Sequence, residues 1–341
     1  MPSRQILCAA TAAAAAADIV GDVAQQQQPL SLADVVLVCL SLVSFVSIAW
    51  FALSSCWKLG SHFRSADNIF ERTRGEKRVD LGPGHAYSFV QQYREDGMGV
   101  GSALWDGSIV LAEHLIDSAP AACKAAGGGG AALDLAGKRV LELGTGVGLV
   151  SIVAARLGAS EVVATDGDAA LLPLTRRNVA RNLGGSGSGE NGEACGAGGM
   201  PAQELAERRA AAKVLRVEEL LWGDEAQQAA VGAGGLFDVI LAADVVYESS
   251  INKGAMLQAY EGLFESMWQL SHDDTLVLLA YKQRFATEPL FFSVMTEYFE
   301  QEQLQTDKLA AHAEHSGLQI FRYRKRKDRH GEAAGAAVKR D

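Results

Sequence analysis

The chain has 341 residues, enough for one large or two ordinary domains with a substantial core. It carries 31 Lys and Arg against 41 Asp and Glu, so its formal charge is −10. This acidic balance excludes a general nucleic-acid-coating protein, because such proteins need a basic surface to bind phosphates. The five cysteines are far apart and the seven histidines form no ligand cluster, so no metal site is expected.

The first 58 residues do not have the composition of a folded domain. Residues 1–31 are rich in alanine and glutamine and are expected to form a disordered leader. Val35–Trp57 contains 23 consecutive uncharged residues. A helix of that length measures roughly 34 Å and spans the roughly 30 Å core of a bilayer. We therefore expect residues 32–58 to be a transmembrane anchor; a buried or docking helix is the alternative.

The charges that flank this segment predict its orientation. Acidic residues precede it, and six Lys and Arg follow it between Lys58 and Arg78. The positive-inside rule then places the long C-terminal part in the cytosol. We expect a membrane-anchored protein whose long C-terminal part faces the cytoplasm, with a purely cytoplasmic protein as the alternative.

After a juxtamembrane linker at 59–79, the pattern over residues 80–327 predicts one α/β domain. Short β-branched runs alternate with amphipathic stretches, which is typical of βαβ units around a parallel sheet. The expected strands are 139–143, 162–165, 214–217, 237–246, 275–281 and 318–323, and the expected helices are 148–157, 168–183, 251–270 and 288–299. Three glycine- and alanine-rich segments, 125–132, 184–200 and 229–235, are expected to be flexible insertions. Residues 328–341 are expected to form a basic disordered tail.

The most informative pattern lies between Arg139 and Asp166. An apolar strand runs into the glycine-rich segment Gly144–Gly148, and a helical pattern follows. A turn of this kind lets a ligand approach the backbone and points the free N–H groups of the helix at it. The next strand ends about 20 residues further on at Asp166, where a carboxylate can accept hydrogen bonds from ribose hydroxyls. The combination predicts a nucleotide-type pocket.

The spacing of the glycines indicates which nucleotide. A dinucleotide loop has glycine at its first, third and sixth positions, whereas in this chain the third glycine, Gly148, is at the fifth position. The loop also contains no Lys or Arg, which suits a cofactor without phosphate. The pattern acid-x-Gly-x-Gly-x-Gly, beginning at Glu142, resembles the first motif of the Class I, seven-β-strand S-adenosylmethionine (SAM)-dependent methyltransferases. This resemblance implies a Rossmann-like seven-stranded α/β domain with SAM as its cofactor.

Further motifs resemble one branch of that family, the METTL-type non-histone protein lysine methyltransferases. Trp105 precedes the first strand, Leu221–Gly223 follows the third, and Ala243 closes the fourth. The sequence from Asp244 to Tyr247 then matches the hallmark Asp/Glu-x-x-Tyr/Phe of the branch. The resemblance covers roughly residues 80–327.

The resemblance also implies which residues contact the cofactor. They are Trp105, Glu142, Gly144, Gly146, Gly148, Asp166, Trp222 and Ala243. Each tryptophan has an alternative as a core aromatic residue, and Glu142 has one as a brace for the turn. Asn178 and Asn182 are interpreted as helix-surface or packing residues rather than ligands.

Asp244 and Tyr247 are the predicted catalytic residues. They follow a central strand at its carboxyl end, where open α/β sheets bind their ligands. Methyl transfer to an amine requires alignment and a free lone pair, so neither residue needs to be a strong base. The alternative is an aspartate that caps a turn beside a half-buried tyrosine.

The predicted partner is a protein substrate, of the chaperone or translation-factor class that the resemblance implies. Enzymes that methylate nucleobase amines carry two prolines where this chain has Val245 and Val246, so nucleic acid is not expected as a partner. A membrane contact is expected through residues 35–57, and the catalytic domain is expected to be monomeric. The alternatives are a membrane-tethered small-molecule or lipid methyltransferase and a non-catalytic SAM-binding module.

Overall fold

The computed structural model describes residues 74–92, 99–120, 132–184, 201–246, 253–283, 289–305 and 317–327. All of them belong to one compact unit within residues 66–341. The expected leader, anchor and basic tail lie outside the described residues, and so does Tyr247. Within the seven described ranges, no helix combines the length and the apolar character needed to cross a membrane.

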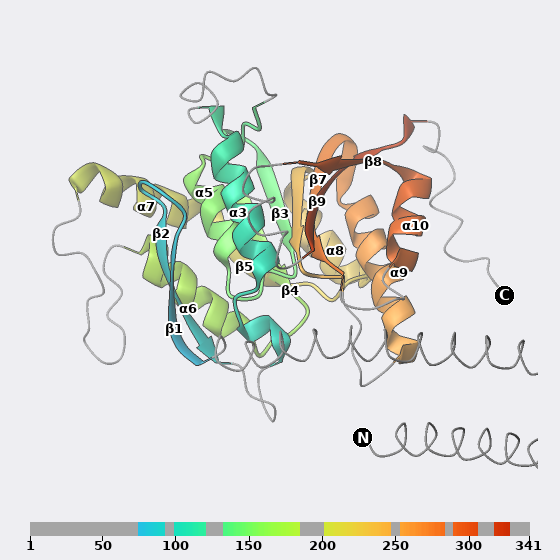
Figure 1. The fold of residues 1–341 in the computed structure, drawn as a ribbon, viewed down its shortest axis with the longest axis horizontal. Coiled ribbons are helices and arrows are strands. Elements are labelled where there is room, and N and C mark those ends of the chain that lie inside the picture. Colours follow the sequence, from blue (N-terminus) through green and yellow to red (C-terminus); the bar gives the residue numbers. More distant parts are fainter. Residues whose placement is uncertain are drawn as a thin grey trace, which may run out of the picture. The chain divides into compact units, whose positions relative to one another are not determined.

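A seven-stranded sheet forms the centre of the unit. Its strands are β3 (Arg139–Leu143), β4 (Glu161–Asp166), β5 (Leu215–Glu219), β6 (Phe237–Ala243), β7 (Ser271–Lys282), β8 (Phe299–Leu304) and β9 (Leu318–Lys325), in the spatial order β5-β4-β3-β6-β7-β9-β8. Strands β5, β4, β3, β6 and β7 are parallel, and β9 is inserted antiparallel between β7 and β8 (Figure 1). The predicted Rossmann-like α/β class with a mostly parallel sheet is confirmed.

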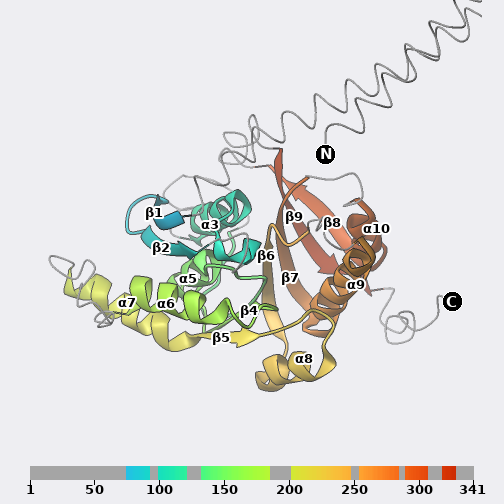
Figure 2. The ribbon, with the colours of Figure 1, turned by 90° about the horizontal axis from the view of Figure 1, so that it is seen from below.

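Helices cover both faces of this sheet, as Figures 1 and 2 show. One face carries α3 (Asp106–Ser118), α5 (Leu149–Arg156), α6 (Leu172–Leu183) and α7 (Ala202–Val214), and the other carries α8 (Glu225–Val231), α9 (Lys253–Gln269) and α10 (Pro289–Tyr298). Each face has its own apolar cluster: Leu111 and Ile152 are fully buried in the first, and Leu263 and Met295 in the second. Because both faces are covered, the central strands are apolar on both sides.

An N-terminal hairpin, β1 (Arg74–Asp80) and β2 (Ala86–Gln92), packs beside α6. Asn182 accepts a hydrogen bond from the Ser88 backbone N–H at 2.8 Å and donates one to the Ser88 carbonyl at 2.9 Å. Asn178 makes the same pair of bonds with Val90, at 2.9 and 3.1 Å. Both asparagines are buried between the hairpin and α6, which agrees with a packing role. The hairpin itself was not predicted, and β1 begins inside the segment expected to be a linker.

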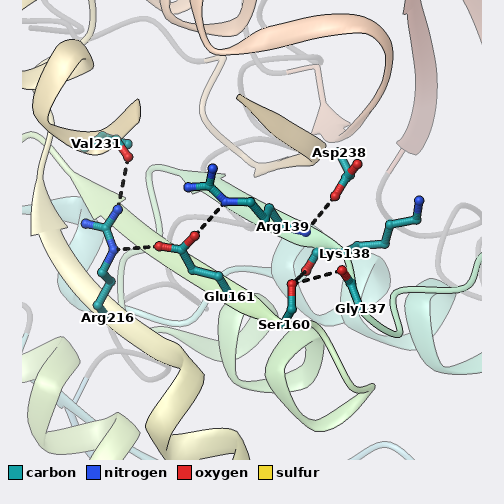
Figure 3. A network of polar contacts seen from close by, with 8 residues as sticks. All are labelled: Gly137, Lys138, Arg139, Ser160, Glu161, Arg216, Val231 and Asp238. Atoms are coloured by element: carbon teal, nitrogen blue, oxygen red, sulfur yellow. Dashed lines mark hydrogen bonds and ion pairs between the residues drawn. The ribbon is translucent and has the colours of Figure 1, made fainter. Parts of the chain in front are cut away.

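The amino ends of the parallel strands are tied together by charged side chains (Figure 3). Glu161 accepts a hydrogen bond from Arg139 Nε at 2.7 Å and another from Arg216 Nε at 3.2 Å. Asp238, near the start of β6, accepts a bond from the Arg139 backbone N–H at 2.8 Å. This network links four neighbouring strands at their amino ends, opposite the ends at which the glycine-rich segment lies.

The prediction of a flexible insertion at 229–235 is wrong. Helix α8 continues to Val231, whose side chain is buried, and a 3-10 turn follows at Gly232–Gly234. The helix begins at a normal N-cap, because Asp224 Oδ1 accepts a bond from the Gln227 N–H at 2.9 Å. Residues 121–131 and 185–200, which include most of the other two expected insertions, lie outside the described residues.

Candidate active site

The candidate residues lie together at the carboxyl ends of the parallel strands. Gly144–Gly148 follows β3, Asp166 ends β4, Trp222 follows β5, and Asp244 follows β6. β3 has β4, the next strand in the chain, as its neighbour on one side and β6 as its neighbour on the other, so the strand order reverses direction at β3. Ligands of open α/β sheets bind at such a switch point.

The glycine-rich segment requires glycine at three positions. Gly144, Gly146 and Gly148 have φ values of 72°, 54° and 97°, in the left-handed region that disfavours other residues. Space is also restricted, because a Cβ on Gly146 would lie 2.8 Å from the Gly101 carbonyl oxygen. A Cβ on Gly144 would lie 2.7 Å from Val245 Cγ1. This turn therefore brings the segment before α3 and the end of β6 close to the backbone of the loop.

The side chain of Glu142 stabilises this turn by hydrogen bonds. Its Oε2 accepts hydrogen bonds from the Thr145 hydroxyl at 2.7 Å, from the Ser151 N–H at 2.9 Å and from the Ser151 hydroxyl. The side chain is fully buried, and this burial raises the pKa of Glu142 to about 7. The described contacts are those of a brace for the turn, which was one of the two roles expected for this residue.

Asp166 lies beside the loop, as the strand pattern predicts. Its Oδ2 accepts a hydrogen bond from the Gly146 N–H at 3.0 Å, and its Oδ1 accepts one from the Asp168 N–H at 3.1 Å. Burial raises the pKa of Asp166. Thr175 on α6 donates from its hydroxyl to the Gly146 carbonyl at 2.6 Å. Sequence reasoning missed Thr175; its spacing of three residues from Asn178 on the same helix was the available signal.

The two predicted tryptophans have different surroundings. Trp222 is half-buried, and its Cζ2 lies 3.3 Å from the position of a Cβ on Gly144. Its Nε1 is buried and has no hydrogen-bond partner in the described part of the chain. Trp105 directly precedes α3, and its Nε1 donates to the Val100 carbonyl at 2.8 Å. Trp222 thus contacts both the second apolar cluster and the site, whereas Trp105 stabilises its own segment.

The end of β6 holds the last two described candidates. Ala243 is half-buried and pairs with Ala280 of β7. Asp244 follows it with φ 56°, and among the described residues it is the one non-glycine with a positive φ. Its N–H donates to the Ala280 carbonyl at 2.9 Å, and its Oδ2 accepts from the Gly107 N–H at 2.8 Å. Sequence reasoning did not connect Gly107 with this site, because 137 residues separate it from Asp244.

The sequence of this domain matches a known family model. Residues 88–188 and 202–298, more than half of the chain, match the model described as lysine methyltransferase. The chain belongs to this lysine methyltransferase family. The matched segments contain the glycine loop, Asp166, both tryptophans and the Asp-x-x-Tyr motif. The reaction of the family is the SAM-dependent methylation of lysine in a protein, which confirms the predicted enzyme class and cofactor.

Relatives of this lysine methyltransferase include METTL21A of Danio rerio, named a protein N-lysine methyltransferase. It is 30% identical over 210 residues, which cover 62% of this chain and 73% of the relative. The protein-lysine methyltransferase METTL21E of Mus musculus is 31% identical over 169 residues, which cover 50% and 55%. Among solved structures, a T. Thermophilus 16S rRNA methyltransferase in complex with AdoMet and guanosine aligns with a TM-score of 0.41 and 15% identity, over 74% of this chain and 51% of that one.

The residues at the carboxyl edge fit SAM. The loop at Gly144–Gly148 contains no cationic side chain, which suits a cofactor without phosphate. Asp166 provides a carboxylate directly beside Gly146. Trp222 provides a flat apolar face next to Gly144 and suits an adenine ring.

Proposed function

We propose that this lysine methyltransferase binds SAM across the carboxyl ends of β3, β4 and β5 and accepts the target lysine beyond the end of β6. The observation that carries this assignment is the approach of Asp166 to Gly146, at 3.0 Å, on the same sheet edge as Asp244. In this arrangement the loop would hold the amino-acid part of the cofactor. Asp166 would accept from the ribose, and Trp222 and Trp105 would flank the adenine.

The reaction is an in-line displacement, so positioning is the main contribution of the protein. The bound cofactor supplies a methyl group on a positively charged sulfur. The target lysine has an unperturbed pKa of about 10.4 and must lose its proton before it can attack. Burial and a neighbouring positive charge both lower the pKa of an amine. We propose that Tyr247 forms the wall of the channel that buries the lysine.

The proposed substrate is a protein of the chaperone or translation-factor class. The relatives are named protein lysine methyltransferases, and the acidic chain is suited to a protein partner rather than to nucleic acid. Val245 and Val246 are buried where nucleobase methyltransferases need prolines around a planar amine. These two side chains pack in the core of the second face instead.

This proposal is tested with the full-length chain, labelled SAM and a cell lysate. We expect label on lysine in the protein fraction, and we expect Tyr247→Ala, which removes the proposed channel wall, to reduce the labelling while cofactor binding is kept. Label confined to the organic-soluble fraction would instead show a lipid or small-molecule methyltransferase. Cofactor binding without labelling of any fraction would show a non-catalytic binding module.

We further propose that Val35–Trp57 anchors the enzyme in a membrane with its catalytic domain in the cytoplasm. The support is the 23-residue uncharged run and the basic residues that follow it. The full chain should sediment with membranes after alkaline carbonate washing, and the catalytic domain should be digested by protease added to the cytoplasmic side. A chain that stays in the supernatant would contradict the anchor.

A further inference from the structure

Asp244 adopts a backbone conformation that turns the chain sharply at the end of β6. Its φ of 56° lies in the left-handed region, where L-residues other than glycine are strained and Asp and Asn are tolerated best. The side chain is 9% exposed, and the Asp244 N–H is held by the Ala280 carbonyl of β7. The turn is therefore fixed by the sheet, and it places the carboxylate against the start of α3.

The carboxylate of Asp244 caps helix α3 from a distant part of the chain. The first N–H groups of a helix have no partner within the helix, and Trp105 at the N-cap makes no side-chain cap bond. Asp244 Oδ2 accepts from the N–H of Gly107, the second residue of α3, at 2.8 Å. A negative group is favoured at this position by the helix dipole.

The position of Gly107 requires glycine because there is no space for a side chain. A Cβ at this position would lie 2.6 Å from Asp244 Oδ2 and 2.7 Å from Asp244 Cγ. Glycine in a helix costs up to about 1 kcal/mol relative to alanine, so its presence at this position is explained by the contact rather than by helix propensity. The contact with the Asp244 carboxylate thus depends on glycine at position 107.

The segment that directly precedes α3 in the chain contacts the glycine loop. We call residues 99–105 the strap. Its Gly101 carbonyl faces Gly146 of the loop, since a Cβ on Gly146 would lie 2.8 Å from that oxygen. Its Leu104 N–H donates to Gln91 Oε1 of β2 at 2.8 Å. The strap is therefore fixed by the hairpin and, through α3, by Asp244.

We propose that Asp244 is a positioning residue, whose carboxylate holds the start of α3 and thereby keeps the strap against the glycine loop. Its Oδ2 accepts the Gly107 N–H at 2.8 Å, which is the bond that this role requires. The role rests on the proposed function, because it concerns the same site. It makes the first residue of the Asp-x-x-Tyr motif a determinant of cofactor binding as well as of turnover.

The test compares Asp244→Asn with Asp244→Ala in the full-length chain, purified with detergent present. Asparagine tolerates a positive φ and keeps an oxygen that accepts from Gly107, but it has no negative charge. Alanine removes the acceptor. Gly107→Ala breaks the same bond from the other side. Asp238, near the start of the strand that Asp244 follows, provides the control because its Oδ2 also accepts a distant backbone N–H, at 2.8 Å, at the amino ends of the strands.

The positioning role predicts that Asp244→Asn keeps SAM affinity and kcat within about threefold of the wild type, with an unchanged pH profile of kcat. Asp244→Ala and Gly107→Ala should each weaken SAM binding by about tenfold or more, as titration calorimetry measures, and the double variant should be no weaker than either single one. Asp238→Ala should lower the Tm without changing SAM affinity.

The inference is overturned if Asp244→Asn loses as much turnover as Asp244→Ala while SAM affinity is unchanged in both. That result would show a charge that acts on the lysine. If Asp244→Ala does not fold, the Asp244→Asn variant decides alone, because the two roles predict opposite results for it. If the wild type binds SAM but methylates no protein, the proposed function fails, and the SAM affinities of the variants still decide the role of Asp244.

Discussion

The carboxylate of Glu142 and the first turn of α5 are joined through Ser151, which donates both its N–H and its hydroxyl to Glu142 Oε2. The bond links the last part of β3 to the helix across the glycine loop. Because the carboxylate is fully buried, its pKa is raised from 4.5 to about 7. The carboxyl group of Glu142, which stabilises the loop, therefore titrates near neutral pH.

This titration predicts a pH dependence of stability. A carboxyl group whose pKa is higher in the folded state contributes stability below its unfolded pKa, and the contribution is lost as pH rises through the folded value. For Glu142 the loss falls between pH 4.5 and about 7. It amounts to about 3 kcal/mol at 1.36 kcal/mol per unit. Glu142→Gln should lack this component when free energies of unfolding are measured across that range. Parallel curves for wild type and variant would contradict the prediction.

Gly146→Ala should abolish SAM binding. The substitution places a Cβ 2.8 Å from the Gly101 carbonyl and costs about 1–2 kcal/mol for the left-handed backbone. Gly158→Ala is the matched control, because Gly158 also has a positive φ (91°) but its Cβ meets Ala136 only at 3.6 Å. Both variants should lose stability, and only Gly158→Ala should keep the SAM-induced rise in Tm. Equal rises in both would show that the loop does not bind the cofactor.

Trp222→Phe should weaken SAM binding without breaking a described hydrogen bond in the free enzyme. The indole Nε1 is buried without a partner among the described residues, so its removal costs no hydrogen bond there. At 100 times Kd the ligand stabilises the wild type by about 2.7 kcal/mol, and tenfold weaker binding at the same concentration reduces this to about 1.4 kcal/mol. Thermal unfolding with and without SAM measures the difference. Trp268→Phe, in the aromatic cluster of α9, should keep the full effect.

Asn182→Ala should loosen the hairpin. The substitution leaves the Ser88 N–H and carbonyl without their partners, at a cost of about 1–3 kcal/mol. Hydrogen exchange of the Ser88 amide should accelerate, while exchange in β6 should not change. Gln203→Ala, an exposed change on α7, is the control. Slow exchange at Ser88 in the Asn182 variant would show that the hairpin is held in another way.

The central part of the fold was predictable from the sequence because its signals are local. The strand 139–143, the glycine loop and Asp166 follow one another within a single βαβ unit, and the structure has them as expected. Apolar runs likewise identified β6, although the strand ends at Ala243 rather than at Val246. The chain turns there because Asp244 adopts a positive φ.

The features that were missed depend on partners far away in the sequence. β1 is mostly polar and gives no strand signal, and β2 is held by two asparagines about 90 positions later. The bond between Asp244 and Gly107 spans 137 positions and involves a backbone N–H, which no sequence pattern reveals. The segment 229–235 was misread because its small residues resemble a linker, while the helix is specified by the cap at Asp224.

The paired asparagines of α6 also bear on solubility. An unpaired strand edge can recruit a strand from another molecule and so begin aggregation. Asn178 and Asn182 match the backbone of β2 at alternate residues, so side-chain amides fill the places that a foreign strand would need. The same two side chains that attach the hairpin therefore protect that edge against intermolecular β-pairing.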